Sequence, residues 1–157
     1  MRSDNSQTFF MTGATGFLGQ FILRDLLVRG GRVIALLRGS PAESTARLCK
    51  QMYDMGSPVE EYLGDGRLEV VEGSMPNQLP QMTWGRTDAI VNCAASLQLF
   101  SNGKGDPFNT HVAGIKAILD WADANRVHRL PAVSTAYTCG WNSGKIMERF
   151  YQPEPKF

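Results

Sequence analysis

The segment Thr12-Gly13-Ala14-Thr15-Gly16-Phe17-Leu18-Gly19 spaces its glycines evenly, with two other residues between each glycine and the next. A short apolar run precedes the segment and a helical pattern follows it, so the glycines lie in a strand–turn–helix unit. In such a unit the first glycine permits the tight turn, the second lets a phosphate approach the backbone, and the third allows close packing of the helix. We predict a pyrophosphate-binding loop at the helix start, where free N–H groups attract anions. The alternative is a glycine-rich turn without a ligand.

On either side of this loop, short apolar runs alternate with helical patterns, which predicts βαβ units. We expect an α/β fold of the Rossmann type, a doubly wound parallel sheet of about five strands in the order 3-2-1-4-5. The expected strands are residues 8–11, 32–37, 68–72, 89–92 and 129–134. The expected helices are residues 17–29, 40–55 and 106–125, with a short extra turn at 59–63.

Two of these helices carry more detailed predictions. The second one begins at Ser40-Pro41, and Ser40 with Glu43 has the pattern of a capping box, in which each side chain bonds a backbone N–H. The last helix is expected to bury an apolar stripe formed by Phe108, Val112, Ile115 and Leu119.

Composition limits the class of protein. The 157 residues suit one domain, which we place at residues 8–144 between a polar tail (1–7) and an irregular segment (145–157). The net charge of +1 argues against general affinity for nucleic acid or acidic membranes, and no apolar run reaches the roughly 18 residues of a membrane span. Three widely spaced cysteines predict neither a disulfide framework nor a metal site, and they fit the cytoplasm.

Ligands of open α/β sheets bind beyond the carboxyl ends of the strands, which makes the residues there candidates. Arg38 closes the second strand, where a positive residue accommodates the 2′-phosphate of NADP and an acidic one selects NAD. Arg47, in the following helix, is a second candidate for that phosphate. We favour NADP over NAD; the alternative is that both arginines are simply solvated.

Small and hydroxylated residues follow the later strands. Ala94, Ala95 and Ser96 follow the fourth strand, where they either leave room for a ribose or pack tightly. Ser134 and Thr135 follow the fifth strand, where a hydroxyl either bonds a substrate carbonyl or satisfies a loop.

Together these residues resemble the extended short-chain dehydrogenase/reductases, and most closely their thioester reductase-like branch. That branch includes the terminal reductase domains of carboxylic acid reductases and nonribosomal peptide synthetases, and the fatty acyl reductases. The resemblance extends over about residues 8–144. It rests on residues 10–19, 33–38, 88–95 and 133–137, in that order.

The resemblance implies a role for each matching residue. The pyrophosphate would be surrounded by Gly13, Thr15, Gly16, Phe17, Leu18 and Gly19. The 2′-phosphate would be bound by Arg38 and Arg47, and the ribose path would be lined by Ala94, Ala95 and Ser96. Ser134 would also contribute to the cofactor site. Thr135 would be the hydroxyl member of a catalytic Thr/Tyr/Lys set that acts on an acyl-carrier thioester or an aldehyde.

Three features depart from the family pattern. Ser74 stands where the family has an Asp that contacts adenine, and its hydroxyl still offers a hydrogen bond. His111 stands where an Asn supports the active-site backbone; it either substitutes as a donor or is merely accommodated in packing. The sequence contains no Tyr-x-x-x-Lys, the pair that supplies a proton to the substrate carbonyl in this family.

We therefore expect the NADP-binding part of a thioester or acyl reductase, shortened before Tyr-x-x-x-Lys, with a sheet that is incomplete relative to the family and without full catalytic machinery. Two alternatives remain: a fragment of a sugar-nucleotide epimerase or reductase of the same superfamily, and a non-catalytic nucleotide-binding or interaction module. A fold fragment that binds nothing is a further one. We also expect a homo-oligomer formed through the exposed sheet edge, because an unpaired edge is a template for pairing.

Overall fold

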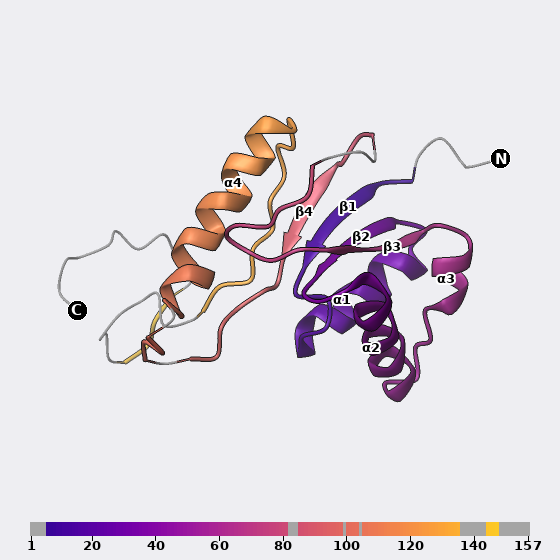
Figure 1. The fold of residues 1–157 in the computed structure, drawn as a ribbon, viewed down its shortest axis with the longest axis horizontal. Coiled ribbons are helices and arrows are strands. Elements are labelled where there is room, and N and C mark those ends of the chain that lie inside the picture. Colours follow the sequence, from indigo (N-terminus) through magenta and orange to yellow (C-terminus); the bar gives the residue numbers. More distant parts are fainter. Residues whose placement is uncertain (1–5, 82–84, 99, 104, 136–143, 148–157) are drawn as a thin grey trace.

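The centre of the fold is a parallel sheet, seen in a computed structural model that describes residues 6–81, 85–98, 100–103, 105–135 and 144–147 (Figure 1). The strand order is β3-β2-β1-β4, as predicted for the first four strands. The strands are β1 (Thr8–Thr12), β2 (Arg32–Leu37), β3 (Leu68–Glu72) and β4 (Ala89–Asn92). The helices are α1 (Phe17–Val28), α2 (Pro41–Asp54), α3 (Glu60–Gly64) and α4 (Gly114–Ala124), and a π-helical turn, η1 (Asn109–Ala113), leads into α4.

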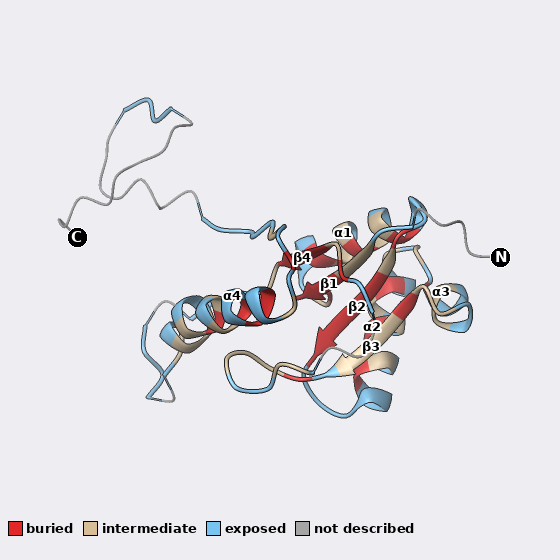
Figure 2. Cartoon of the chain, turned by 90° about the horizontal axis from the view of Figure 1, so that it is seen from above, coloured by how far each residue is buried: buried red, intermediate tan, exposed pale blue. Residues whose placement is uncertain are grey.

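Helices cover both faces of the sheet, which makes three layers. Met11 belongs to an apolar cluster with residues of α1 and α2, such as Leu23 and Leu48. The neighbouring Phe10 belongs to a second cluster with residues of α4, because successive side chains of a strand point to opposite faces. Strands β2 and β4 and the second half of β1 are therefore mostly buried (Figure 2), whereas β3 at the edge of the sheet is mostly half-buried. The continuous apolar run of β2 follows from burial on both faces.

The expected fifth strand at residues 129–134 is only partly formed. Three backbone hydrogen bonds of 2.9 Å join residues 129–133 to β4, so the segment runs parallel to β4 in the predicted place. The ladder is nevertheless reduced to an isolated bridge between Asn92 and Ala132. Pro131 explains this, because it lacks the N–H that would complete a second bridge opposite Ile90.

The predicted buried stripe of the last helix is wrong. Phe108, Val112 and Leu119 are 62%, 52% and 48% exposed, and Ile115 is half-buried. The helix instead buries Gly114, Ile118, Trp121 and Ala122 against the sheet. The regular α-helix also begins later than predicted, because residues 109–113 form the π-helical turn.

Trp121 accounts for this orientation of α4. Its ring stacks on Phe10 of β1 with the centroids 4.5 Å apart. Its indole N–H donates to the carbonyl of Pro80 at 2.8 Å, which satisfies a polar group that burial would otherwise leave without a partner. Both faces of the helix are apolar, so periodicity alone could not identify the one that faces the sheet.

The predicted capping box of α2 is also wrong. Ser40 precedes the helix as expected, but its side chain makes no hydrogen bond to a backbone N–H. The Ser40 hydroxyl donates instead to Oε2 of Glu43 at 2.8 Å. The buried Ser44 hydroxyl fixes this end of α2 by donating to the carbonyl of Arg38 at 2.9 Å.

Candidate nucleotide-binding site

The carboxyl ends of the strands meet at one edge of the sheet, because all four strands are parallel. In the register of the sheet, Thr12 at the end of β1 lies between Leu36 of β2 and Asn92 of β4. The glycine turn therefore lies at the centre of this edge, with the loops after the other strands beside it. This is the edge at which ligands of open α/β sheets bind.

The glycine turn takes the predicted tight form. Gly13 has a φ of 72°, a conformation that residues with side chains rarely adopt. The N–H of Gly16 donates to the carbonyl of Gly13 at 2.9 Å and closes the turn. A Cβ on Gly13 would lie 2.5 Å from the backbone N of Ala94, so the loop after β4 packs directly on this residue.

The start of α1 forms an open cradle. A Cβ on Gly19 would collide with the carbonyl of Gly13, so the helix packs tightly on the turn. A Cβ on Gly16 would meet only that same carbonyl, at 3.2 Å, and would otherwise fill open space. No side chain caps α1, although its first N–H groups have no acceptors within the helix, and Phe17 is 85% exposed. These features fit a pyrophosphate bound at the helix start.

Two buried polar residues hold this cradle against the next loop, and the sequence analysis missed both. The Thr12 hydroxyl donates to Oδ1 of Asn92 at 2.5 Å and accepts the N–H of Ala94 at 3.3 Å. The Thr12 carbonyl accepts the N–H of Cys93 at 3.1 Å. The available signal was a polar residue at the end of each of two apolar strands, since buried polar groups almost always have partners.

A cationic corner follows β2. Arg38 and Arg47 are both exposed, and Nη2 of Arg47 donates to the carbonyl of Arg38 at 2.9 Å. The structure thus brings the two candidate arginines to one place, although they are nine positions apart in sequence. Glu43 brings a carboxylate near the same corner. If Gly39, the residue after Arg38, carried a Cβ, that atom would lie 4.0 Å from Oε2 of Glu43.

The candidate residues after β4 lie beside the glycine turn. Ala94 and Ser96 are half-buried, and Ala95 between them is exposed. Nε2 of His111 lies 3.0 Å from the carbonyl oxygen of Ser96. Of the two roles considered for His111, the structure therefore supports contact with the backbone of this loop. Burial raises the pKa of the neighbouring Cys93 thiol.

The remaining candidates are placed as follows. The Ser74 hydroxyl donates to Oε1 of Gln78 at 3.0 Å, and the backbones of these two residues also pair, so the loop after β3 is closed on itself. Ser134 and Thr135 are exposed and follow the segment that runs beside β4, which brings them to the same sheet edge. Residues 136 and 137, the end of the last segment that carries the resemblance, lie outside the described residues.

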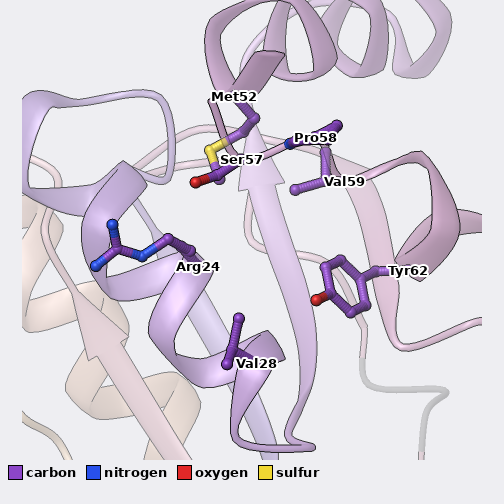
Figure 3. Close-up of a pocket in the computed structure, with 7 residues that line it drawn as sticks. All are labelled: Arg24, Val28, Met52, Ser57, Pro58, Val59 and Tyr62. Carbon is purple, nitrogen blue, oxygen red and sulfur yellow. The ribbon is translucent and has the colours of Figure 1, made fainter. Parts of the chain in front are cut away.

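One further hollow lies apart from these residues, between α1 and the segment that joins α2 to α3 (Figure 3). Its volume is about 190 Å³. It is lined by Arg24, Val28, Met52, Ser57, Pro58, Val59 and Tyr62. None of the candidate site residues is among them, and a nearby carboxylate, Asp25, already binds Arg24 at 2.7 Å.

A doubly wound parallel sheet with an open phosphate cradle between its first strand and first helix defines the class of Rossmann-type dinucleotide-binding domains. More particularly, the chain belongs to the NAD-binding family described as male sterility protein, whose model matches residues 11–156. Its sequence and structural relatives identify it as part of the thioester reductase-like branch of the short-chain dehydrogenase/reductases.

Three relatives illustrate this membership. The chain is 35% identical over 149 residues to the isonitrile lipopeptide synthase of Mycobacterium tuberculosis, a match covering 85% of this chain and 6% of that protein. It is 40% identical over 105 residues to the carboxylic acid reductase of the same organism, covering 57% of this chain and 9% of that one. The terminal R domain from the myxalamid PKS-NRPS pathway superposes with a TM-score of 0.72 and 27% identity, over 87% of this chain and 36% of that domain. The chain thus spans only a small part of these relatives.

Proposed function

We propose that this chain binds NADP(H) and serves as the cofactor-binding portion of a thioester or carboxylic acid reductase. The open cradle at the start of α1 carries the proposal, because its uncapped N–H groups and the space beside Gly16 suit a pyrophosphate. The two arginines after β2 favour the 2′-phosphate of NADP, since a guanidinium group can donate two parallel hydrogen bonds to the oxygens of a phosphate. NAD remains the runner-up because Glu43 stands at the same corner.

Each part of the cofactor has a place along the sheet edge. Thr15, Gly16, Phe17 and Leu18 would surround the pyrophosphate, with Gly13 and Gly19 shaping the turn. Arg38 and Arg47 would hold the 2′-phosphate, and Ser74 would meet the adenine. Ala94, Ala95 and Ser96 would line the path of a cofactor ribose, and Ser134 would also contribute to the cofactor site. The bound cofactor would supply a hydride.

The substrate that fits this proposal is an acyl-carrier thioester or the aldehyde derived from it. The names of the relatives support that choice, since they include a lipopeptide synthase, a carboxylic acid reductase and a terminal R domain. Thr135 would donate a hydrogen bond from its hydroxyl to the substrate carbonyl at the carboxyl ends of the strands. Because no Tyr-x-x-x-Lys supplies a general acid, we expect this 157-residue polypeptide to bind cofactor without turnover.

We further propose a cytoplasmic protein that self-associates through the outermost strand of its sheet, the segment of residues 129–133 beside β4. Free cysteines at positions 49 and 93 support a reducing compartment. Within the described part of the chain, no helix is both long and apolar enough to cross a membrane.

Titration with NADPH and NADH, followed by fluorescence and by thermal unfolding, tests the proposal. NADPH at 100 times its dissociation constant should add about 2.7 kcal/mol of stability. Arg38→Gln should lower the preference for NADPH over NADH by roughly tenfold or more, because charge-assisted hydrogen bonds contribute about 1.5–3 kcal/mol. Arg29→Gln is the matched control, since Arg29 is exposed at the far end of α1.

The outcomes separate the alternatives. No binding of either dinucleotide would contradict the proposal and favour a fold fragment without a ligand. Equal affinity for the two dinucleotides in wild type, with no effect of Arg38→Gln, would contradict the choice of NADP. Turnover of an aldehyde or thioester would contradict the expected lack of activity.

A further inference from the structure

We propose that the amino end of the sheet carries a docking surface for a short acidic segment of a partner polypeptide. This amino-end surface consists of Arg86, which precedes β4, and of Arg126, His128 and Arg129, which follow α4. All four side chains are exposed. The surface lies at the opposite end of the sheet from the candidate nucleotide site, so the inference does not depend on the proposed function.

The first support is that the four residues come from two adjoining segments. The carbonyl of Arg129 accepts the N–H of Ile90 at 2.9 Å, and the segment that begins there runs parallel to β4. The residues that precede this segment and those that precede β4 therefore lie at the same end of the sheet (Figure 1). Between Arg126 and His128, the side chain of Val127 is only 5% exposed and fixes the loop in the apolar cluster beneath α4.

The second support is the backbone of Arg126, the one described residue other than glycine that has a positive φ, at 57°. Its N–H donates to the carbonyl of Asp123 at 3.2 Å, and the N–H of Val127 donates to the carbonyl of Ala122 at 2.9 Å. This pattern ends a helix on a left-handed residue, which is usually glycine because a side chain is strained there. An exposed arginine adds nothing to the core, so its presence at a strained position indicates a function for the side chain.

The third support is the charge of the amino-end surface. No described carboxylate forms an ion pair with Arg126 or Arg129, and the exposed Asp123 nearby pairs with neither. Arg86 pairs with Asp88 at 2.8 Å, but its side chain is 88% exposed. Carboxylates bind arginine through paired hydrogen bonds, so an acidic peptide complements the surface. Nucleic acids and anionic membranes are bound by clusters of roughly four to ten cations, more than the unpaired arginines of this surface supply.

The experiment measures, at low salt, the fluorescence anisotropy of a labelled peptide of alternating Glu and Ser, together with thermal unfolding of each protein. Arg126→Gly should weaken peptide binding about twofold to fivefold, as for the loss of one exposed ion pair, and Arg126→Gly/Arg129→Gln should weaken it further. Arg126→Gly should also raise the midpoint of thermal unfolding by about 2–4 °C, because glycine is unstrained at this φ. Arg126→Lys keeps both charge and strain and should match wild type in both measurements. Arg29→Gln, at an exposed arginine that ends α1 on the other face of the sheet, is the matched control and should bind like wild type.

Several results would overturn the inference. It fails if wild type binds the Glu–Ser peptide no better than a Gln–Ser peptide of the same length, or if Arg126→Gly/Arg129→Gln binds as well as wild type. It also fails if the unfolding midpoint of Arg126→Gly does not rise, because the arginine would then be explained by its favourable charge at the end of the α4 dipole. Tighter binding of single-stranded DNA or of phosphatidylserine vesicles than of the peptide would assign the surface to another class of partner. No dinucleotide is present in these measurements, so their outcome is separate from that of the NADPH titration.

Discussion

At the residue scale, the three glycines of the loop differ in what surrounds them. Gly13 and Gly19 are enclosed by protein backbone, so their lack of a side chain allows the turn, the helix and the loop after β4 to pack together. Gly16 faces open space and has an ordinary backbone conformation, with a φ of −76°. The spacing in the sequence does not distinguish these two situations, because it carries no information about what lies opposite each glycine.

Alanine substitutions should therefore separate structure from binding. We expect Gly13→Ala to lower the free energy of unfolding by about 1–3 kcal/mol, because a side chain there is strained at the positive φ and collides with the backbone of Ala94. Gly16→Ala should change folding stability by no more than about 0.5 kcal/mol but weaken NADPH binding at least about tenfold, because its Cβ enters the cradle. Urea unfolding and NADPH titration measure the two effects. A stable Gly13→Ala variant, or undiminished binding by Gly16→Ala, would contradict this assignment.

At the element scale, the orientation of α4 is set by Trp121. This side chain has both a stacking partner, Phe10, and a hydrogen-bond acceptor, the Pro80 carbonyl. The opposite stripe of the helix, with Leu119, stays exposed in the described structure. A helix that is apolar on two faces has two possible buried sides, and contacts with other elements decide between them.

Truncation of each face tests this orientation. We expect Trp121→Ala to lower the free energy of unfolding by about 3–5 kcal/mol, as usual for a large buried aromatic side chain. Leu119→Ala should change it by no more than about 0.5 kcal/mol, because that side chain is half exposed. Chemical denaturation of both variants measures the difference. Comparable losses in the two variants would show that the helix buries the other face.

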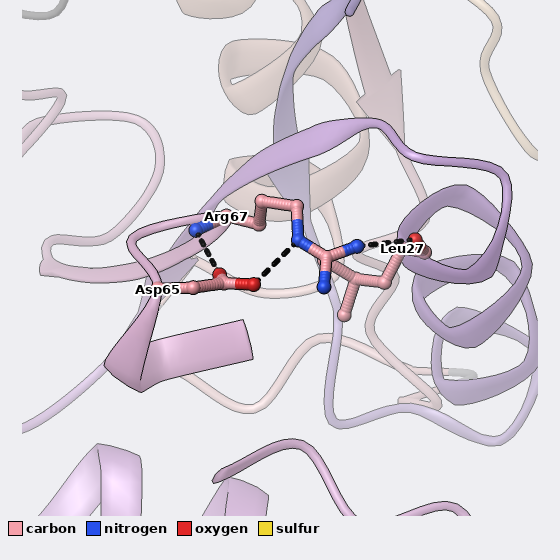
Figure 4. A network of polar contacts seen from close by, with 3 residues as sticks. All are labelled: Leu27, Asp65 and Arg67. Carbon is pink, nitrogen blue, oxygen red and sulfur yellow. Dashed lines mark hydrogen bonds and ion pairs between the residues drawn. The ribbon is translucent and has the colours of Figure 1, made fainter. Parts of the chain in front are cut away.

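A second contact between elements joins the end of α1 to the start of β3 (Figure 4). Arg67 donates to the Asp65 carboxylate at 2.7 Å and to the Leu27 carbonyl at 3.4 Å. Its guanidinium also lies 4.5 Å from the ring centroid of Tyr62. One side chain therefore connects α1, α3 and the strand that follows, and it brings a positive charge to the C-terminal end of the helix dipole of α1.

This contact predicts a specific acid dependence. The backbone N–H of Arg67 donates to Asp65 and is the main reason that the pKa of this carboxyl is lowered from 3.8. The unfolded chain therefore takes up the proton first, so the stabilisation is complete above about pH 4 and is lost as the pH falls through the lower, folded-state pKa. In denaturation between about pH 7 and pH 2.5, Asp65→Asn should lose less stability on acidification than wild type. Parallel losses in the two proteins would contradict the prediction.

At the scale of the whole molecule, the segment beside β4 forms an edge of the sheet whose outward backbone groups pair with no described residue. Residues 129, 131 and 133 direct their backbone toward β4, and the alternate residues Leu130 and Ala132 direct theirs outward. No other described residue bonds to the backbone of Leu130 or Ala132. Pro131 faces inward, so it weakens the bonding to β4 and leaves the outer edge open to another strand.

Self-association through this edge has a direct test. We expect wild type to form a dimer or larger assembly, and Ala132→Pro to reduce that association about tenfold or more by removing the outward N–H. Ala132→Ser, which keeps the N–H, should behave like wild type. Light scattering over a range of concentrations gives the assembly state. A wild-type protein that is monomeric throughout, or equal association in all three proteins, would contradict pairing at this edge.

How much of the site could be predicted depends on the distance over which each contact acts. The glycine turn was predictable, because its residues are consecutive and its geometry is local. The meeting of Arg47 with the carbonyl of Arg38 was only suggested by sequence, since it needs the position of α2 relative to β2. The pairing of Thr12 with Asn92 was missed, because these residues lie 80 positions apart and become neighbours only when β1 pairs with β4.

By itself, the sequence determined the class of fold, the order of the first four strands and the place of the glycine loop, because apolar periodicity and glycine spacing act over a few neighbouring residues. Only the tertiary structure decided which face of α4 is buried, that the fifth strand is reduced to an isolated bridge, and that His111 contacts the loop after β4. Each of these features depends on contacts between residues that are far apart in the sequence and come together only in the folded chain. Contacts of that kind arise from packing and hydrogen bonding between elements, and a local pattern does not specify them.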